Sequence, residues 1–373
     1  MKKVYLDNAS TTQIRPEVVQ AMTKSMLEDF GNPSSSHSYG RNAKNSLETS
    51  RKTIAKLLNV TSQEIIFSSG GTEANNWIIK SAVRDLKIQR IITSKLEHHA
   101  VLHSVLSIQK EYNIKVDFVK TCLNGTIDLT NLVELLTDNS PTLVSLMHVN
   151  NETGEILDLE RVCAICKQSN ALFHTDSVQS IGKTKIDLQQ TKIDFLVASA
   201  HKFHGPKGIG FAFVRKGISL RPMIYGGEQE KGLRAGTESV HNVVGMAEAL
   251  EISYANLESE KEYTSEIKKY CIAELIKNFP QTKIVGSITF YNIVNIILPF
   301  SDEKTSMFLF HLDMKGIAVS RGSACQSGSN KPSHVLAELL SENDLKKPNL
   351  RISFSHYTTR QEIDYLIKVL KTI

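Results

Sequence analysis

The sequence predicts an α/β fold in which a mostly parallel β-sheet is flanked by helices and is accompanied by a smaller α+β domain. Through the first two thirds of the chain, short apolar segments alternate with longer amphipathic ones, as in successive βαβ units. The length of 373 residues exceeds what one hydrophobic core usually supports. From about residue 254 the sequence becomes more charged, and β-rich stretches follow. We therefore expect a large domain over 14–253 and a small domain formed by 1–13 and 254–373.

Composition and charge are those of an ordinary globular protein. The chain is 41% hydrophobic, and its 44 basic and 39 acidic residues are interspersed, which argues against direct binding of nucleic acid. The N-terminal segment reaches Asp7 before any apolar run, unlike a signal peptide, and no apolar run approaches the ~20 residues of a membrane span. The cysteines are odd in number and scattered, so no disulfide framework is expected. These features predict a soluble, cytoplasmic protein.

Local signals place the elements in order. Pro16 follows an extended segment and a polar turn, and proline suits the first turn of a helix. Apolar runs between turn residues predict strands, and the amphipathic stretches between them predict helices. The expected strands are 64–68, 90–93, 116–121, 142–148, 172–174, 193–198, 209–214, 283–285, 289–298, 318–320 and one around 351. The expected helices are 16–27, 42–58, 129–136, 240–258, 306–314, others beginning near 72 and 100, one around 163–166, and a last one ending at 373.

A Gly-Gly turn after the strand at 64–68 is a candidate anion site. The segment Ser69-Gly70-Gly71-Thr72 leads into a helix, whose free backbone N–H groups and positive end favour an anion. The pattern is neither Walker A nor G-x-G-x-x-G. The alternative is a plain strand-to-helix turn capped by Thr72. In the functional interpretation, the turn is a phosphate-binding site, called the phosphate cup below.

Lys202 lies where the strand at 193–198 gives way to a Gly/Pro-containing loop. An amine packed against a core at a strand end is partly desolvated, which lowers its pKa and makes it nucleophilic. The alternative is a lysine in a surface turn, the commonest kind. Lys202 is therefore a candidate for covalent binding of a carbonyl compound.

Polar side chains follow other expected strands in the same relative position. His98 and His99, Asn151, and Asp176 each lie a few residues after the end of one. No metal-ligand spacing surrounds the histidines, and ligands of open α/β sheets bind beyond the carboxyl ends of strands, so one histidine is expected to face a common pocket. Asp176 could equally cap a turn. A carboxylate, an imine-forming lysine and a phosphate cup are together the parts that pyridoxal phosphate requires.

The cysteines and one arginine suggest further chemistry. Cys163 and Cys166 form a C-x-x-C pair inside an amphipathic helix without a second pair, which favours half-buried thiols over a redox or metal pair. Cys325 lies among Gly, Ser and Asn, which predicts an exposed, mobile thiol, and the nearby Arg321 would favour its thiolate. Arg351 is expected within a strand, where a guanidinium needs a carboxylate partner.

Taken together these segments resemble the cysteine desulfurases, which are fold-type I pyridoxal phosphate enzymes of the aminotransferase class V group. The resemblance extends from Tyr5-Leu6-Asp7-Asn8-Ala9 to Arg351-Ile352-Ser353-Phe354-Ser355, nearly the whole chain. Arg321-Gly322-Ser323-Ala324-Cys325 is similar to the subgroup that supplies sulfur for iron-sulfur clusters and tRNA thiolation, and differs from the subgroup with Arg-x-Gly-His-His-Cys.

The resemblance implies a role for each matching residue. Lys202 would bind the cofactor and then move protons, and His98, which directly follows a glutamate as in the family motif, would stack on its ring. Asp176 would hold the pyridinium nitrogen. Arg351 would bind the substrate carboxylate with Asn151. The remaining cofactor contacts would be Gln179 and Asn151 on the ring-oxygen side, Gly71, Thr72, Ser199 and His201 at the phosphate, and Thr237 from the neighbouring subunit of a homodimer.

The implied reaction converts L-cysteine to L-alanine and leaves the sulfur as a persulfide on Cys325, for delivery to an iron-sulfur scaffold or a tRNA thiolase. Cys325 is also a candidate transient ligand of an iron-sulfur cluster. The chain stops soon after its last expected helix, whereas scaffold-docking members continue, and Gln326-Ser327 replaces the Thr-Ser or Thr-Ala of many members. The rival interpretations are a selenocysteine lyase, another class V enzyme such as an aminotransferase, and a non-catalytic sulfur-transfer scaffold.

Overall fold

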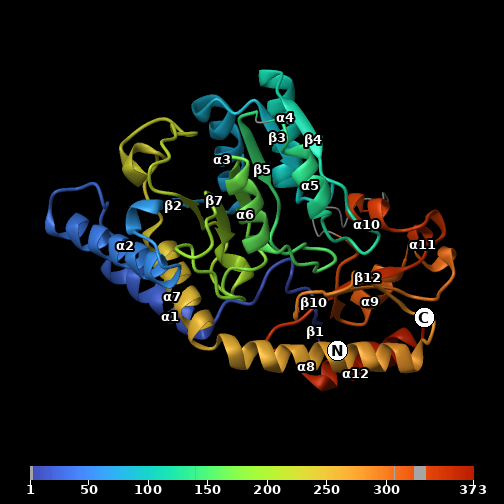
Figure 1. Cartoon of the computed structure of the whole chain (residues 1–373). Helices are drawn as coiled ribbons and strands as arrows, with labels where there is room; N and C mark the ends of the chain where they lie inside the picture. The colour runs from blue at the N-terminus through green and yellow to red at the C-terminus, as the bar shows by residue number, and fades with distance from the viewer. Residues whose placement is uncertain (1–2, 139, 306, 323–332) are drawn as a thin grey trace.

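A seven-stranded sheet forms the centre of the computed structural model, which describes residues 3–138, 140–305, 307–322 and 333–373 (Figure 1). Its strand order is β2-β8-β7-β6-β5-β3-β4. The neighbours from β4 to β7 pair in parallel, and β8 runs antiparallel to both β2 and β7. The expected mostly parallel sheet is thus confirmed. The strands are β2 Ile65–Ser68, β3 Arg90–Thr93, β4 Lys115–Phe118, β5 Thr142–Ser145, β6 Leu172–Asp176, β7 Phe195–Ser199 and β8 Gly210–Val214.

Helices cover both faces of this sheet because its central strands are apolar on both sides. In β7, Phe195 and Val197 join the hydrophobic cluster under α3 and α4, whereas Leu196 and Ala198 join the cluster on the other face. Continuous apolar runs of this kind are typical of strands buried in parallel sheets. The helices are α1 Pro16–Glu28, α2 Ser38–Leu57, α3 Gly71–Leu86, α4 His99–Tyr112, α5 Leu129–Leu135, α6 Leu159–Gln168 and α7 Val240–Ala255.

Several element boundaries differ from those expected. β5 ends at Ser145 instead of at 148, whereas β6 continues to Asp176, so that this aspartate is the last residue of its strand. The helix expected over 240–258 ends at Ala255, and a second helix, α8 Leu257–Asn278, begins after Asn256. The backbone of Asn256 departs from helical values, at φ −103° and ψ 10°, which separates the two helices.

A smaller sheet and its helices form a second hydrophobic cluster. β10 Ile293–Ile297 pairs antiparallel with both β9 Lys283–Val285 and β12 Asn349–Ser353, and β1 Val4–Tyr5 pairs in parallel with β11 Ile317–Ala318. The helix α8 runs below this region beside α12, which spans Arg360–Leu370 (Figure 1). The short helices are α9 Phe308–Met314, α10 His334–Leu339 and α11 Glu342–Lys346.

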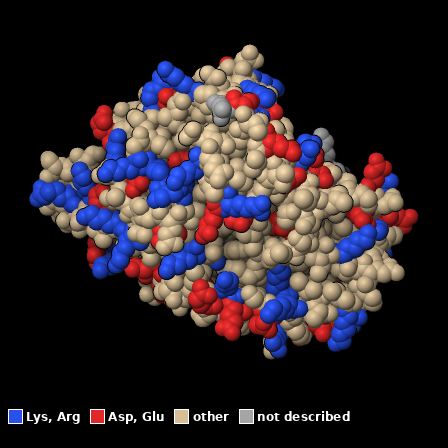
Figure 2. All heavy atoms as spheres, in the orientation of Figure 1, with Lys and Arg blue, Asp and Glu red and all other residues tan. Residues whose placement is uncertain are grey.

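The surface and the thiols agree with an unremarkable globular composition. Acidic and basic side chains are intermingled over much of the face in Figure 2. No helix among the described residues is both long and apolar enough to cross a membrane. Cys163 and Cys166 are buried on α6, and burial raises the pKa of Cys163 to about 12 and that of Cys166 further still. Both thiols are therefore packed in the core, more deeply than the half-buried positions expected.

Candidate active site

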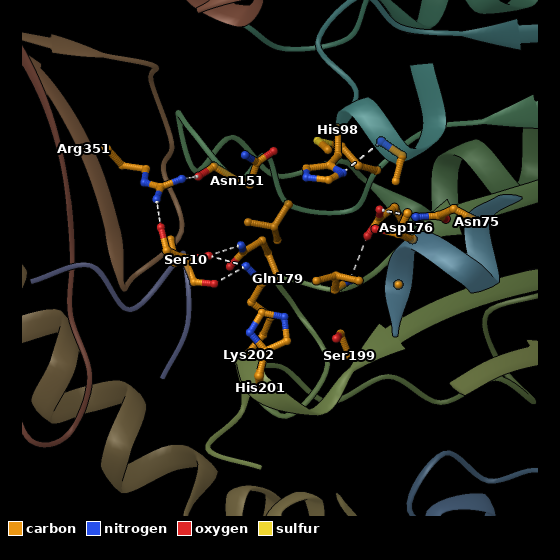
Figure 3. Close-up of a pocket in the computed structure, with 17 residues that line it drawn as sticks. Ser10, Asn75, His98, Asn151, Asp176, Gln179, Ser199, His201, Lys202 and Arg351 are labelled. Carbon is orange, nitrogen blue, oxygen red and sulfur yellow. Dashed lines mark hydrogen bonds between the residues drawn. The ribbon is translucent and has the colours of Figure 1, made fainter. Parts of the chain in front are cut away.

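A cavity of about 220 Å³ lies beyond the carboxyl ends of β6 and β7 and collects most of the predicted site residues (Figure 3). Such a position is usual for ligand sites in open α/β sheets. Two predicted residues are not among its lining. Thr237 is exposed on the loop before α7, and Cys325 lies outside the described residues. The predicted residues that line the cavity are Gly71, Thr72, His98, Asn151, Asp176, Gln179, Ser199, His201, Lys202 and Arg351.

Lys202 points into the cavity. It ends the short 3-10 helix Ala200–Lys202, which directly follows β7. Its Nζ donates hydrogen bonds to the carbonyl oxygens of Ala9 and Ser10, each at 2.7 Å. Both acceptors belong to the N-terminal segment. The sequence around Lys202 does not indicate this contact. The geometry therefore differs from that of a lysine in a surface turn, because the amine is fixed inside a pocket.

Asp176 presents a buried carboxylate to the same cavity. Its side chain Oδ2 accepts a hydrogen bond from Asn75 Nδ2 at 2.7 Å, and its Oδ1 accepts one from the backbone N–H of Val178 at 3.0 Å. Asp176 is 6% exposed and Asn75 is 1% exposed. Asn75 lies on α3, one turn after Gly71. It was not among the predicted site residues, because no local signal links an asparagine in this helix to an aspartate 101 residues away. The Gly-Gly turn therefore lines one part of the cavity, and the helix after it holds the Asp176 carboxylate in another part.

His98 and His99 have different environments. His98 lines the cavity, and its Nδ1 accepts a hydrogen bond from the backbone N–H of Ala100 at 3.1 Å, which leaves the proton of a neutral ring on Nε2. Burial lowers the pKa of His98, with the Asp176 carboxylate opposing the shift, so the ring is neutral. His99 instead contacts the rings of His103 and His334, at centroid distances of 4.6 and 4.4 Å. Of the pair, His98 faces the pocket.

The Gly-Gly turn forms a narrow cradle at the start of α3. Gly70 has φ 148°, which favours glycine, and a Cβ on Gly71 would lie 2.7 Å from Val178 Cγ2. Ser199, the last residue of β7, and His201 in the 3-10 helix that follows line the same pocket as this turn. Burial, with Lys202 and other cations nearby, lowers the pKa of His201 to about 3, so its ring is neutral. Lys207, which was not predicted, lines the outer part of the cradle and adds positive charge.

Arg351 on β12 approaches the cavity from the smaller sheet. Its guanidinium donates to Asp7 Oδ1 and to Asn151 O, each at 2.9 Å, and to Ser10 Oγ at 2.6 Å. The carboxylate that a buried arginine requires is therefore Asp7, at a sequence separation of 344 residues. Figure 3 shows Arg351 and Asn151 on the opposite side of the cavity from Asp176.

Gln179 lies between Lys202 and the buried Lys183. Its Nε2 donates to Ala9 O at 2.8 Å, and its Oε1 accepts from Lys183 Nζ at 3.4 Å. Burial, together with the nearby Lys202, lowers the pKa of Lys183 to about 7. Ala9 O is thus shared by Gln179 and Lys202, which fixes the amide orientation relative to the amine.

These residues fit pyridoxal phosphate. A side chain at Gly71 would clash with Val178, so glycine allows the backbone of this turn to line the cavity. The turn lies at the N-terminus of α3, where free backbone N–H groups favour a phosphate. Asp176 offers a buried carboxylate for a protonated ring nitrogen, and Lys202 offers an amine for the aldehyde. Between them the cavity has an apolar lining formed by Ala100, Met147, Val149 and Val178.

The fold and this set of groups define the class of protein, an α/β enzyme built around pyridoxal phosphate. A model of the family described as aminotransferase class-V matches residues 4–366. The chain therefore belongs to the class-V aminotransferase family, and the family, the fold-type I architecture and the cofactor expected from the sequence are confirmed.

Several relatives that match this chain over its whole length are named cysteine desulfurases or NifS-like proteins. The cysteine desulfurase IscS of Dictyoglomus turgidum is 39% identical over 374 residues, which cover 100% of this chain and 94% of the relative. A solved structure of a NifS-like protein superposes with a TM-score of 0.91 at 34% identity and covers 100% of both chains. A structure of SspA in complex with cysteine has a TM-score of 0.82 at 30% identity, covering 96% of this chain and 100% of the other.

Proposed function

We propose that the chain is a pyridoxal phosphate-dependent cysteine desulfurase that converts L-cysteine to L-alanine and transfers the sulfur to Cys325. The observation that carries the proposal is the juxtaposition of Lys202, Asp176 and the Gly71 cradle around one cavity. Similarity to cysteine desulfurases over the whole chain supports the choice of substrate. A relative solved with cysteine bound supports it further.

The residues of the cavity divide into holding and reacting groups. Gly71, Thr72, Ser199 and His201 would bind the cofactor phosphate, with Thr237 reaching it from a second subunit. Asp176 would pair with the ring nitrogen, and Gln179 and Asn151 would contact the ring-oxygen side. Bound pyridoxal phosphate supplies an electron sink for the Cα carbanion.

Arg351 and Lys202 would act on the substrate itself. The Arg351 guanidinium would bind the substrate carboxylate beside Asn151, and to do so it must share or exchange its bonds to Asp7 and Ser10. Lys202 Nζ would move the proton to and from Cα, because the amine lies inside the cavity. The neutral His98 ring would stack on the cofactor. Its Nε2 carries a proton that it could donate to the sulfur-bearing end of the substrate.

The sulfur leaves through Cys325. Its thiolate attacks the substrate sulfur, so an S–S bond forms on Cys325 as the substrate C–S bond breaks, and Cβ takes up a proton to give alanine. L-Cysteine plus the Cys325 thiol thus yields L-alanine plus the Cys325 persulfide. No external oxidant or reductant is needed for this step. Release of the sulfur needs an acceptor.

The assembly proposed here has two domains and two subunits. The large domain, 14–253, carries the cofactor site, and the small domain, 1–13 with 254–373, carries Arg351 and the segment containing Cys325. The exposure of Thr237, away from the cavity of its own chain, supports a homodimer in which it completes the partner's site. Delivery of sulfur to an iron-sulfur scaffold or a tRNA thiolase in the cytoplasm, and transient cluster ligation by Cys325, belong to the same proposal.

The test measures alanine and sulfide from L-cysteine in the presence of a thiol reductant, for the cofactor-loaded wild type, Lys202→Ala and Cys325→Ser. Equimolar products from the wild type alone are expected. Alanine that persists in Cys325→Ser would contradict the persulfide route and favour a lyase. A wild type that binds the cofactor and forms no alanine would overturn the proposal.

A further inference from the structure

An acidic side chain lies beside the phosphate cup. Glu73, in the first turn of α3, lines an outer pocket of about 370 Å³ that borders the cup. The residues that share this pocket include Gly71, Thr72, Ser199 and Lys207. A phosphate bound there would have a like charge beside it, which weakens binding unless a cation offsets that charge.

Glu73 also helps to shape the cup. Its Oε2 accepts a hydrogen bond from the backbone N–H of Ser69 at 2.9 Å. Glu73 is the third residue of α3, and a glutamate at this position commonly accepts from the backbone just before a helix. The chain therefore uses this side chain to fix the turn, although its charge opposes a bound anion.

Arg234 supplies a cation for this carboxylate. Its Nε donates to Glu73 Oε1 at 2.9 Å and its Nη2 donates to Oε2 at 3.3 Å, across 161 residues of sequence. Burial raises the pKa of Glu73, but the hydrogen bonds from Arg234 and Ser69 outweigh burial and bring this pKa below its usual value. Glu73 is therefore ionised, and the two-point bond fixes its orientation. Arg234 itself is not among the residues that line the cavity or the outer pocket.

The loop that carries Arg234 is anchored to the strand that leads into the cup. Glu230, which is 5% exposed, accepts from Arg51 Nη1 and Nη2 at 2.7 and 2.8 Å. It also accepts from the backbone N–H of Phe67 on β2 at 2.8 Å. Glu230 and Lys231 have φ values of 47° and 62°, and two consecutive non-glycine residues in this region persist only where surrounding contacts hold them. The loop therefore presents Arg234 to Glu73 from a fixed base.

We propose that Arg234 is a positioning residue for the cofactor phosphate, which pairs with Glu73 and offsets the charge of that carboxylate beside the cup. The role rests on the proposed function for the placement of the phosphate at Gly71 and Thr72. It does not depend on the reaction that follows. Loss of the guanidinium should weaken the binding of a phosphate-bearing cofactor, and removal of the Glu73 charge in the same chain should restore it.

The experiment compares Arg234→Met, Glu73→Gln and the double variant with the matched control Arg221→Met. Arg221 lies in the same connection between β8 and α7, but its Nε donates to Asp85 Oδ1 at 2.6 Å, in the last turn of α3. The control thus removes a guanidinium at the opposite end of the same helix. Each full-length protein is stripped of cofactor and titrated with pyridoxal phosphate and, separately, with pyridoxal, which lacks the phosphate. The visible absorbance of the bound compound reports both affinities at one ionic strength.

Arg234→Met should weaken the affinity for pyridoxal phosphate by about tenfold or more and the affinity for pyridoxal by less than about threefold. The double variant should return to within about threefold of the wild type, because the amide oxygen of Gln accepts from Ser69 without a charge. Glu73→Gln alone and Arg221→Met should both stay within about threefold of the wild type.

Two results would overturn the role of Arg234. Equal losses for the two compounds would mean that the guanidinium acts on the fold and not on the phosphate. A double variant that stays as weak as Arg234→Met would mean that Arg234 acts by holding the loop that bears Thr237. A wild type that shows this rescue but forms no alanine from L-cysteine would refute the proposed reaction and leave the role of Arg234 supported.

Discussion

Replacement of Asn75 by alanine tests how the Asp176 carboxylate is held. The bond from Asn75 Nδ2 to Asp176 Oδ2 is 2.7 Å long, and both side chains are almost fully buried. A hydrogen bond to a charged group contributes about 1.5–3 kcal/mol. Without cofactor, water in the cavity can replace the lost amide, but a bound ring would exclude that water. Most of the loss should therefore fall on the cofactor-bound state.

The expected result is cofactor affinity weakened by between about tenfold and a hundredfold, since 1.4 kcal/mol corresponds to a factor of ten. The assay is equilibrium titration with pyridoxal phosphate, followed by the visible absorbance of the bound cofactor. Asn76→Ala is the matched control, because its amide lies on the same helix and donates instead to Thr72 O at 2.9 Å. An Asn75→Ala affinity within twofold of that control would refute the reasoning.

Three further predictions concern other charged groups. Arg351→Lys loses a planar fork that binds carboxylates at two points, so KM for cysteine should rise at least about tenfold with normal cofactor absorbance; an unchanged KM would contradict its role. The buried Arg51 guanidinium lies 2.7 Å from the equally buried Glu230 carboxylate. Arg51→Met leaves this carboxylate without a cation and should reduce the free energy of unfolding in urea by about 3–5 kcal/mol. Adding Glu230→Gln should recover part of that loss, and no recovery would mean that the pair is not the cause. Burial lowers the pKa of His148 from 6.5 to about 4, so between these values the unfolded chain binds a proton that the folded chain does not. Wild type should therefore lose about 1.4 kcal/mol per pH unit below 6.5 relative to His148→Gln, and parallel pH profiles of the two proteins would exclude this.

The sheet and the strand-end residues were predictable because both depend on local signals. Apolar runs indicate every strand of the large sheet. Parallel strands bring the side chains that follow them to one edge of the sheet, and this rule predicts the common pocket of His98, Asp176 and Lys202 that the structure contains. The predicted strand over 172–174 ended two residues too early, because β6 continues to Asp176. A short run of apolar residues does not define where the hydrogen bonding between strands stops.

The contacts that hold those side chains were not predictable, because they join distant parts of the chain. Asn75 and Asp176 are 101 residues apart, and Asp7 and Arg351 are 344 apart. A single sequence indicates that a buried arginine needs a carboxylate, but it does not indicate which one.

The bonds of the N-terminal segment impose an order on synthesis. The backbone carbonyls of Ala9 and Ser10 accept hydrogen bonds from Lys202. Asp7 can pair with Arg351 only after the ribosome has added 344 further residues. At about 5–20 residues per second, that interval is roughly 20 to 70 s. During this time the first residues made have no strand β12 to join. The complete pocket therefore forms only once β12 has been made, and a nascent chain that stalls before β12 would lack the arginine that lines the cavity.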